Sequence, residues 1–351
     1  MARSLAASSG REALESIRQH EQVLVAQLNH SNVRSRAVPN DPNYGFQWHF
    51  NNDGSNAPGP ADIQAEAAWD ISTGGLTTRG DTIVIAVIDG GIDLNHEDLQ
   101  LFKNRAEIPN NGLDDDNNGY VDDYDGWNAF NSTGSVPNDG HGTNVSGIAG
   151  AKGNNNVGVT GINWDVQVLP IAGDAAIESI VLEAYGYVLE MRARYNETNG
   201  AEGAYIAVTN SSFGVDKKQP ADFPLWCAFY DSLGAEGILS VGATTNQSTN
   251  VDVEGDIPTA CTSDFLVAVT NTNSWDQIES NAGYGASSID IGAPGVNIYT
   301  TFFGSNYGFT SGTSMSTPQV AGAIALMYSV ICQTRFQQFE NDPAGLAMWV
   351  R

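Results

Sequence analysis

The stretch IVIAVIDGGID, residues 83–93, decides the fold, because it has the pattern of a buried strand that ends on an acid. Six apolar residues run without a polar interruption, as expected of a strand covered by helices on both faces. Two glycines after Asp89 let the chain turn away at once. We therefore expect a parallel sheet that presents Asp89 at its carboxyl edge, where active sites of such sheets lie. Taken alone, one acid after a strand is weak evidence, and an Asp that only caps a loop is the alternative.

Strand-like and helix-like segments alternate along the rest of the chain. Near-continuous apolar runs occupy residues 83–88, 166–171, 205–210, 237–243 and 265–270. Helix candidates lie between or after them, at residues 141–151, 175–194, 222–235 and 314–330. This alternation predicts an α/β fold, a three-layer sandwich with a mostly parallel sheet.

A second notable segment is DGHGTNVSGIAG, residues 139–150, which places His141 between Gly140 and Gly142. Glycines on both sides permit close approach of neighbouring backbone or of a substrate. A lone histidine is more often structural than catalytic, and the other four in this chain lack such neighbours. The setting of His141 favours a general acid and base.

The third segment is SGTSMSTPQVAG, residues 311–322, in which Ser314 begins an apolar helix. The N-terminus of a helix offers unpaired N–H donors and favours negative charge, so an oxyanion could form there. A simple helix N-cap is the alternative for an isolated serine.

The three residues together make a functional hypothesis. Serine is a poor nucleophile unless an imidazole takes its proton and a carboxylate orients that imidazole. The chain order is Asp89, His141, Ser314, which is the order in subtilisin. An α/β-hydrolase elbow is excluded, because Ser316 stands where GxSxG requires a second glycine.

These segments, with APGVNIY at residues 293–299, resemble the signature blocks of the subtilase family over about residues 43–335. The resemblance implies a subtilisin-like fold and a serine endopeptidase that acts on polypeptides through an acyl-enzyme. Ser314 would be the nucleophile, His141 the general acid and base, and Asp89 the residue that orients His141. No catalytic cofactor is implied.

The resemblance also suggests a division of the chain. Residues 1–37 are interpreted as a propeptide-like segment or linker, residues 38–335 as the peptidase domain, and residues 336–351 as a C-terminal extension without an assigned role.

Further site residues follow from the same resemblance. Asn246 would be the oxyanion donor, although Thr245 stands where the family usually has glycine; an ordinary loop asparagine is the alternative. Ser212, Phe213 and Gly214 would pair with an extended substrate as an edge strand does. Gln319 replaces a histidine common in the family, five residues after Ser314, and catalysis should survive this.

The acidic stretch DDDNNGYVDDYD, residues 114–125, has the spacing of a calcium loop. Clustered carboxylates repel one another unless a cation is bound, and a solvated acidic loop is the alternative. The loop is not an EF-hand proper, since its last position is Asp and no helix pattern flanks it. The expected ligands are Asp114, Asp116, Asn118, Tyr120 through its carbonyl, Asp122 and Asp125.

A second structural calcium site is implied by the resemblance alone. Its side-chain ligands would be Asp98 and Asn155, completed by the carbonyls of Gly153, Val157 and Val159. An Asn-rich turn that needs no ion is the alternative.

Composition narrows the classes of partner. The chain has 15 Lys and Arg against 41 Asp and Glu, a net charge of −26, which disfavours nucleic acid and anionic lipid. The longest apolar run, residues 320–332, is interrupted and shorter than the roughly 18 residues of a membrane span. The first thirty residues show no signal peptide pattern. We expect a monomer without a membrane span.

The three cysteines, Cys227, Cys261 and Cys332, lack metal-ligand spacing. At most one internal disulfide can form, and Cys227–Cys261 is the pair we favour; free buried thiols are the alternative.

Two other functions stay open at this point. One is a catalytically silent subtilase fold that only binds peptides. The other is a calcium-dependent structural or adhesion module, which the acidic loop and net charge would serve. Export, to the medium or the cell surface, follows from family habit and from the calcium sites, because cytosolic calcium is too scarce to fill weak ones.

Overall fold

The computed structural model describes residues 37–175 and 177–351. The propeptide-like segment predicted for residues 1–37 lies outside these residues, apart from Ala37.

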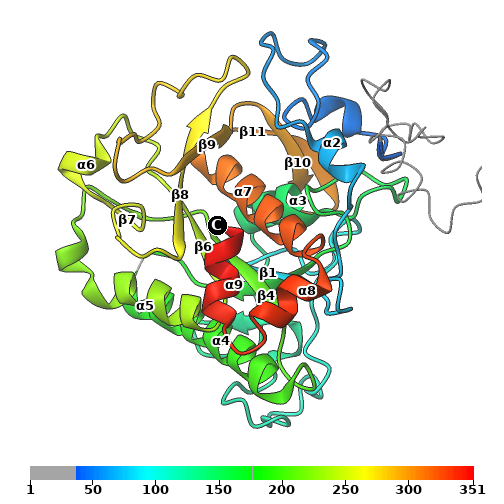
Figure 1. The fold of residues 1–351 in the computed structure, drawn as a ribbon, viewed down its shortest axis with the longest axis vertical. Helices are drawn as coiled ribbons and strands as arrows, with labels where there is room; N and C mark the ends of the chain where they lie inside the picture. Colours follow the sequence, from blue (N-terminus) through cyan, green and yellow to red (C-terminus); the bar gives the residue numbers. More distant parts are fainter. Residues whose placement is uncertain (1–36, 176) are drawn as a thin grey trace, which may run out of the picture. The chain divides into compact units, whose positions relative to one another are not determined.

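Within the described residues, the central sheet has seven strands and all of its pairings are parallel (Figure 1). The sheet order is β2-β3-β1-β4-β6-β8-β9, so β1 lies inside the sheet. The strands are β1 (Val84–Asp89), β2 (Trp127–Asn128), β3 (Gln167–Ala172), β4 (Ile206–Ser211), β6 (Leu239–Ala243), β8 (Leu266–Thr272) and β9 (Ile291–Pro294). The predicted α/β class and parallel sheet are confirmed.

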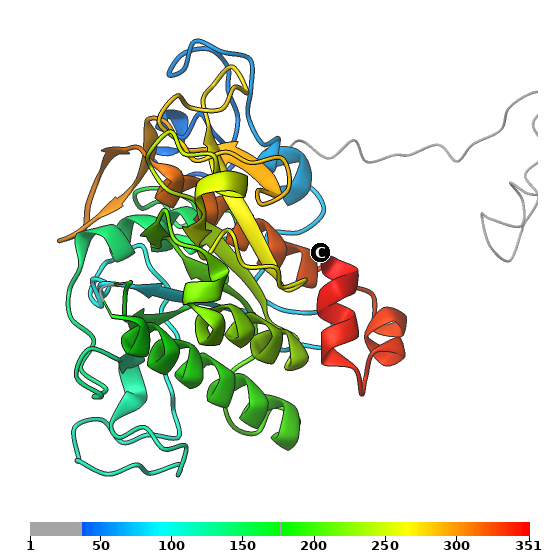
Figure 2. The ribbon, with the colours of Figure 1, turned by 90° about the vertical axis from the view of Figure 1, so that its left-hand side faces the viewer.

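Helices cover both faces of this sheet, and β1 shows why its sequence is apolar throughout. Ile85 and Val87 pack into one core with α3 (Gly140–Gly150) and α7 (Thr313–Tyr328). Ala86 and Ile88 point the other way, into a second core with α4 (Glu178–Thr198) and α5 (Pro224–Ala235). Figure 2 shows the sheet between the green helices α4 and α5 and the orange helix α7. Because helices cover both faces of β1, every residue of the strand before Asp89 is buried and apolar.

The remaining elements are short. Two antiparallel pairs stand outside the central sheet: β10 (Ile298–Phe302) with β11 (Asn306–Thr310), and β5 (Val215–Asp216) with β7 (Asp256–Ile257). The short helices are α2 (Ala65–Trp69), α6 (Val251–Glu254), α8 (Gln333–Gln338) and α9 (Pro343–Val350), with 3-10 turns η1 (Tyr44–Phe46), η2 (Asp123–Asp125) and η3 (Pro220–Asp222).

The C-terminal extension contributes to the hydrophobic core that β1 forms with α3 and α7. Phe336 of α8 and Leu346 and Val350 of α9 are buried in the same cluster as Ile85 and Val87. Residues 336–351 therefore shield apolar surface of the sheet layer.

The predicted disulfide is present. Cys227 of α5 is bonded to Cys261, with the two Cα atoms 5.2 Å apart, while Cys332 is a free and exposed thiol. Among the described helices, none combines the length and the apolar character that crossing a bilayer would require.

Candidate active site

Asp89 and His141 meet at the carboxyl end of β1. Asp89 is 5% exposed, and its two carboxylate oxygens lie 3.0 and 2.9 Å from Nδ1 of His141. Donation from Nδ1 to the carboxylate leaves Nε2 as the basic nitrogen of the imidazole. The pair is thus arranged so that His141 can accept a proton at Nε2.

Glycine at position 142 makes this contact possible. A Cβ atom there would lie 1.9 Å from the carbonyl oxygen of Gly91 and 3.1 Å from Cβ of Asp89. Only a residue without a side chain lets α3 begin this close to the end of β1. The flanking glycines noticed in the sequence therefore have different roles, because a Cβ at Gly140 would meet open space.

The charge around His141 alters its proton affinity. Burial by itself lowers the pKa of His141, but the hydrogen bond and charge of Asp89, together with the charge of Asp139, raise it above the ordinary value. Asp139 is also the N-cap of α3, where its Oδ1 accepts the N–H of Gly142 at 2.8 Å.

Ser314 is the second residue of α7, immediately beyond the end of β4 in space. Its Oγ donates to the carbonyl of Ser212 at 3.2 Å, and Oγ of Ser212 donates to the carbonyl of Ser314 at 3.0 Å. The Ser314 hydroxyl must leave the first of these bonds to donate to His141. The Ser314–His141 contact stays a prediction.

Asn246 lies beside the start of α7. Its Oδ1 accepts the N–H of Thr313 at 2.9 Å, which fixes the amide plane and leaves the Nδ2 donors for another partner. Gly312, next to this amide, has φ of +146°, a conformation that L residues rarely adopt. The turn before α7 therefore depends on glycine.

A pocket of about 370 Å³ opens beside Ser314. Asn246 and the predicted substrate residues Ser212, Phe213 and Gly214 all line it. The structure thus brings the predicted nucleophile, oxyanion donor and substrate strand around one cavity, although they are up to 102 positions apart in the chain.

The acidic loop forms a compact oxygen cluster whose membership differs in part from the predicted one. Carboxylate oxygens of Asp114, Asp116 and Glu107 lie within 4.8 Å of one another. Glu107 is 3% exposed; its Oε1 accepts the N–H groups of Asp115 and Asp116, and its buried Oε2 has no partner within residues 37–175 and 177–351. An unpaired buried carboxylate oxygen among other carboxylates fits a hard cation such as Ca²⁺. Sequence reasoning missed Glu107, which precedes the loop pattern by seven residues.

The other predicted ligands of this loop make different contacts. Asp122 accepts the N–H groups of Asn111 and Gly112, and Asp125 pairs with Lys103. Asn118 Oδ1 accepts the N–H of Tyr120. The structure does not gather Asp122 and Asp125 with Glu107, because each carboxylate is already occupied by backbone donors or by an ammonium.

The second predicted calcium site also gains a residue that the sequence did not indicate. Asp98 accepts from Asn155 Nδ2 and from the N–H of Val159, both at 2.8 Å. Asp41 accepts the N–H groups of Asn154 and Asn155 nearby. Burial, and secondarily the charge of Asp41, raises the pKa of Asp98 to about 6. Two buried acids in one site favour a bound cation. The carbonyls of Gly153, Val157 and Val159 stay predicted ligands.

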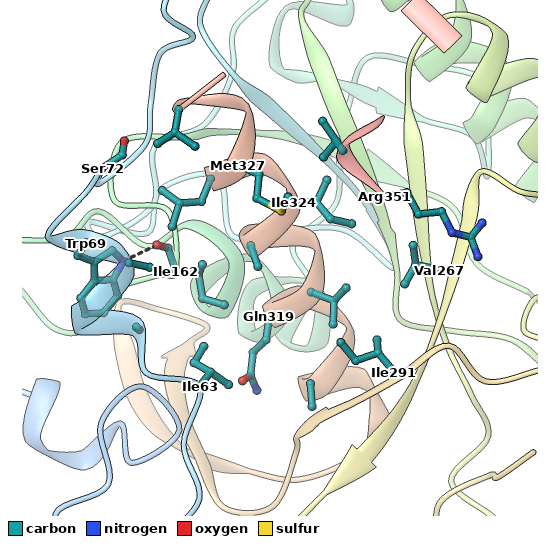
Figure 3. Close-up of a pocket in the computed structure, with 18 of the residues that line it drawn as sticks. Ile63, Trp69, Ser72, Ile162, Val267, Ile291, Gln319, Ile324, Met327 and Arg351 are labelled. Carbon is teal, nitrogen blue, oxygen red and sulfur yellow. Dashed lines mark hydrogen bonds between the residues drawn. The ribbon is translucent and has the colours of Figure 1, made fainter. Parts of the chain in front are cut away.

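A larger hollow of about 730 Å³ lies elsewhere, along α7 (Figure 3). Figure 3 shows Trp69 on one side of it and Val267 and Ile291 on the other. Its lining is mostly apolar and includes none of the predicted catalytic or metal-binding residues. The larger of these two pockets is therefore not the one that contains the candidate active site.

Comparison with known proteins gives a family match. A model described as the subtilase family matches residues 80–338. Over 288 residues the chain is 31% identical to subtilisin-like protease 1 of Plasmodium berghei, covering 76% of this chain and 46% of that protein. Over 342 residues it is 30% identical to an extracellular protease of Xanthomonas campestris, covering 88% of this chain and 52% of that protein. The chain thus spans about half the length of these relatives.

Solved structures agree on the fold. A protease from Pseudoalteromonas arctica superposes with a TM-score of 0.61 and 21% identity, over 89% of this chain and 99% of that one.

Proposed function

This chain belongs to the subtilase family, and from that premise we propose that it is a serine endopeptidase. The observation that carries the proposal is the hydrogen bond between buried Asp89 and His141 Nδ1 at the edge of the sheet. A peptide-binding or structural module gains nothing from an imidazole whose Nε2 is kept basic and half exposed. The side chain of His141 is 43% exposed, which a proton carrier requires.

The proposed reaction has two stages. Ser314 Oγ attacks the scissile carbonyl while His141 Nε2 takes the hydroxyl proton, and the resulting tetrahedral oxyanion is held by Asn246 Nδ2 and the N–H of Ser314. His141 then gives the proton to the leaving amine as the C–N bond breaks. A water molecule attacks the acyl-enzyme by the same route, losing its proton to His141, and the Ser314 oxygen leaves and regains that proton.

Polypeptides are the proposed substrates. The backbone of residues 212–214 runs past Ser314 and lines the same pocket, so an extended peptide could pair with it as an added strand. Backbone pairing gives affinity without demanding a particular sequence.

Calcium is the proposed structural cofactor, and the proposal includes no catalytic cofactor. Glu107, Asp114 and Asp116 would hold one ion, and Asp98 with Asp41 and Asn155 a second. The carboxylates would otherwise repel one another at neutral pH. The ligands of both sites lie in loops, and none of them is a proposed catalytic residue. Calcium would therefore affect the stability of the fold rather than the reaction.

We further propose that the protein works outside the cell, as a monomer. The name of the Xanthomonas campestris relative describes an extracellular protease, and calcium sites of this kind fill more readily outside cells.

Labelling by a fluorophosphonate probe tests the proposal most directly, combined with casein digestion in the presence and absence of EDTA. We expect labelling and digestion by the wild type and neither by Ser314→Ala. Ser316→Ala is not a suitable control because Ser316 is buried, so exposed Ser248→Ala serves instead. A folded wild type that resists both assays but is stabilised by calcium would be a binding or structural module instead.

A further inference from the structure

The pocket beside Ser314 is acidic. Asp216 and Asp256 both line it, and among the residues that the structure describes no Lys, Arg or His does. The two acids sit directly opposite each other in the antiparallel pair of β5 and β7. Like charges at directly opposed positions destabilise a strand pair. This arrangement therefore favours binding of a ligand that carries a positively charged group.

Asp256 is the deeper of the two. The residue is 1% exposed, and its Oδ2 accepts from the hydroxyls of Thr244 and Thr259 and from the N–H of Thr245. Its Oδ1 is buried and has no partner among the described residues. A buried carboxylate oxygen without a donor is costly, and the cost falls when a charged donor reaches it.

The nearby basic residue does not supply that donor. Lys217, which follows Asp216, pairs with Glu254 at 3.0 Å and does not line the pocket. Asp216 itself is exposed, where its carboxylate accepts from Gln247.

We infer that this pocket selects a lysine or arginine side chain of the substrate, with Asp256 as the residue that determines specificity and Asp216 as a second acid. The inference rests on the proposed peptidase function and adds its substrate class. The pocket borders Ser314, so the side chain it receives belongs to the residue that donates the scissile carbonyl. A volume of about 370 Å³ accommodates either long side chain. The methylenes would pass Phe213 and Ala243 before the charged end reaches Oδ1 of Asp256.

Peptide substrates that differ only at this residue test the inference. The measurement is the ratio of kcat/KM for lysine to that for norleucine, which has a similar unbranched chain without charge. We expect a ratio well above 10 for the wild type, falling about 100-fold in Asp256→Asn and less in Asp216→Asn. Exposed Asp222→Asn, which removes the same charge outside the pocket, should leave the ratio unchanged.

A second measurement does not depend on the variants folding. Benzamidine, a small cation, should inhibit cleavage by the wild type competitively, and uncharged benzamide should not. A wild type that cleaves after norleucine as well as after lysine would overturn the inference and leave the peptidase function intact. So would an Asp256→Asn variant that slows both substrates equally, since Asp256 would then only position the Thr244–Asn246 loop. Absence of both cleavage and fluorophosphonate labelling would overturn the proposed function as well.

Discussion

Asn246 is fixed through one side-chain atom and open at the other, as an oxyanion donor must be. Oδ1 accepts the N–H of Thr313, so Nδ2 is already oriented before substrate arrives. A preorganised donor lowers the energy of the oxyanion without reorganising during the reaction.

We therefore expect Asn246→Ala to lower kcat by roughly 10² to 10³ with a smaller change in KM, a magnitude known from subtilisin's own oxyanion asparagine. Steady-state kinetics on one peptide substrate measures both constants. Exposed Ser248→Ala, two positions along the same loop and outside the pocket, is the matched control. Equal kcat values for the two variants would remove Asn246 from the catalytic machinery.

Asp139 offers a second test at the level of one residue. In the proposed mechanism His141 must be neutral at Nε2 to take the serine proton, so activity should rise with pH through the pKa of His141. The charge of Asp139 contributes to raising that pKa. Asp139→Asn should therefore move the acid limb of the kcat/KM profile to lower pH, by about half a unit.

Asparagine retains the helix cap of α3, since its side-chain oxygen can still accept the N–H of Gly142. Loss of the cap thus would not explain a shift. Asp165→Asn, which removes an exposed charge outside the site, should leave the acid limb where it is. A limb that moves to higher pH in Asp139→Asn would contradict this account of the charge around His141.

At the scale of elements, the approach of α3 to β1 is the contact on which the Asp89–His141 pair depends. A methyl group at position 142 would meet a backbone carbonyl at 1.9 Å, and backbone cannot move aside as a flexible side chain can. Gly142→Ala should lower the free energy of unfolding by about 1–3 kcal/mol and kcat/KM by more than the lost stability explains.

Gly140→Ala is a closely matched control for this prediction. It flanks His141 on the other side, lies in the same first turn of α3, and its new methyl group would meet nothing within 4 Å. Urea denaturation and peptide cleavage should therefore find Gly140→Ala close to the wild type. If both variants behave alike, the close packing at Gly142 does not control the site.

Long elements could be predicted from the sequence because each carries its own signal. The buried strand of residues 83–88 is apolar at every position, since both of its faces are covered, and it was found at Val84–Asp89. The helix predicted at residues 141–151 was found at Gly140–Gly150. In contrast, β5 and β7 each have two residues. A strand of two residues is too short to show an alternation of apolar and polar residues. The sequence therefore did not predict that Asp216 and Asp256 face each other.

The residues of the candidate sites also divide into those that local sequence predicts and those that it does not. Asp89, His141 and Ser314 stand in glycine-rich surroundings at the ends of regular elements, which their local sequence reveals. Glu107 and Asp41 do not: each joins its acidic cluster through the folding of a loop with no regular structure. Their roles depend on tertiary contacts that spacing along the chain does not encode.

For the whole molecule, the net charge of −26 means that negatively charged groups repel one another in the folded state. Buried carboxylates add to this repulsion. Cations bound at Glu107, Asp114 and Asp116 and at Asp98 and Asp41 would offset it where it is most concentrated. A ligand that binds only the folded protein stabilises it by about 4 kcal/mol at a thousandfold excess over its Kd.

Removing calcium with EDTA should therefore lower Tm, and readdition of calcium should restore it; differential scanning calorimetry measures both. Glu107→Gln should reduce the calcium-dependent part of Tm, because Oε2 of Glu107 has no other partner in the described part of the chain. Asp125→Asn should not, because that carboxylate pairs with Lys103. Each variant removes one negative charge from the same loop region, so charge alone cannot separate them. The opposite result would restore the ligand set expected from the spacing of residues 114–125 and exclude the cluster that includes Glu107.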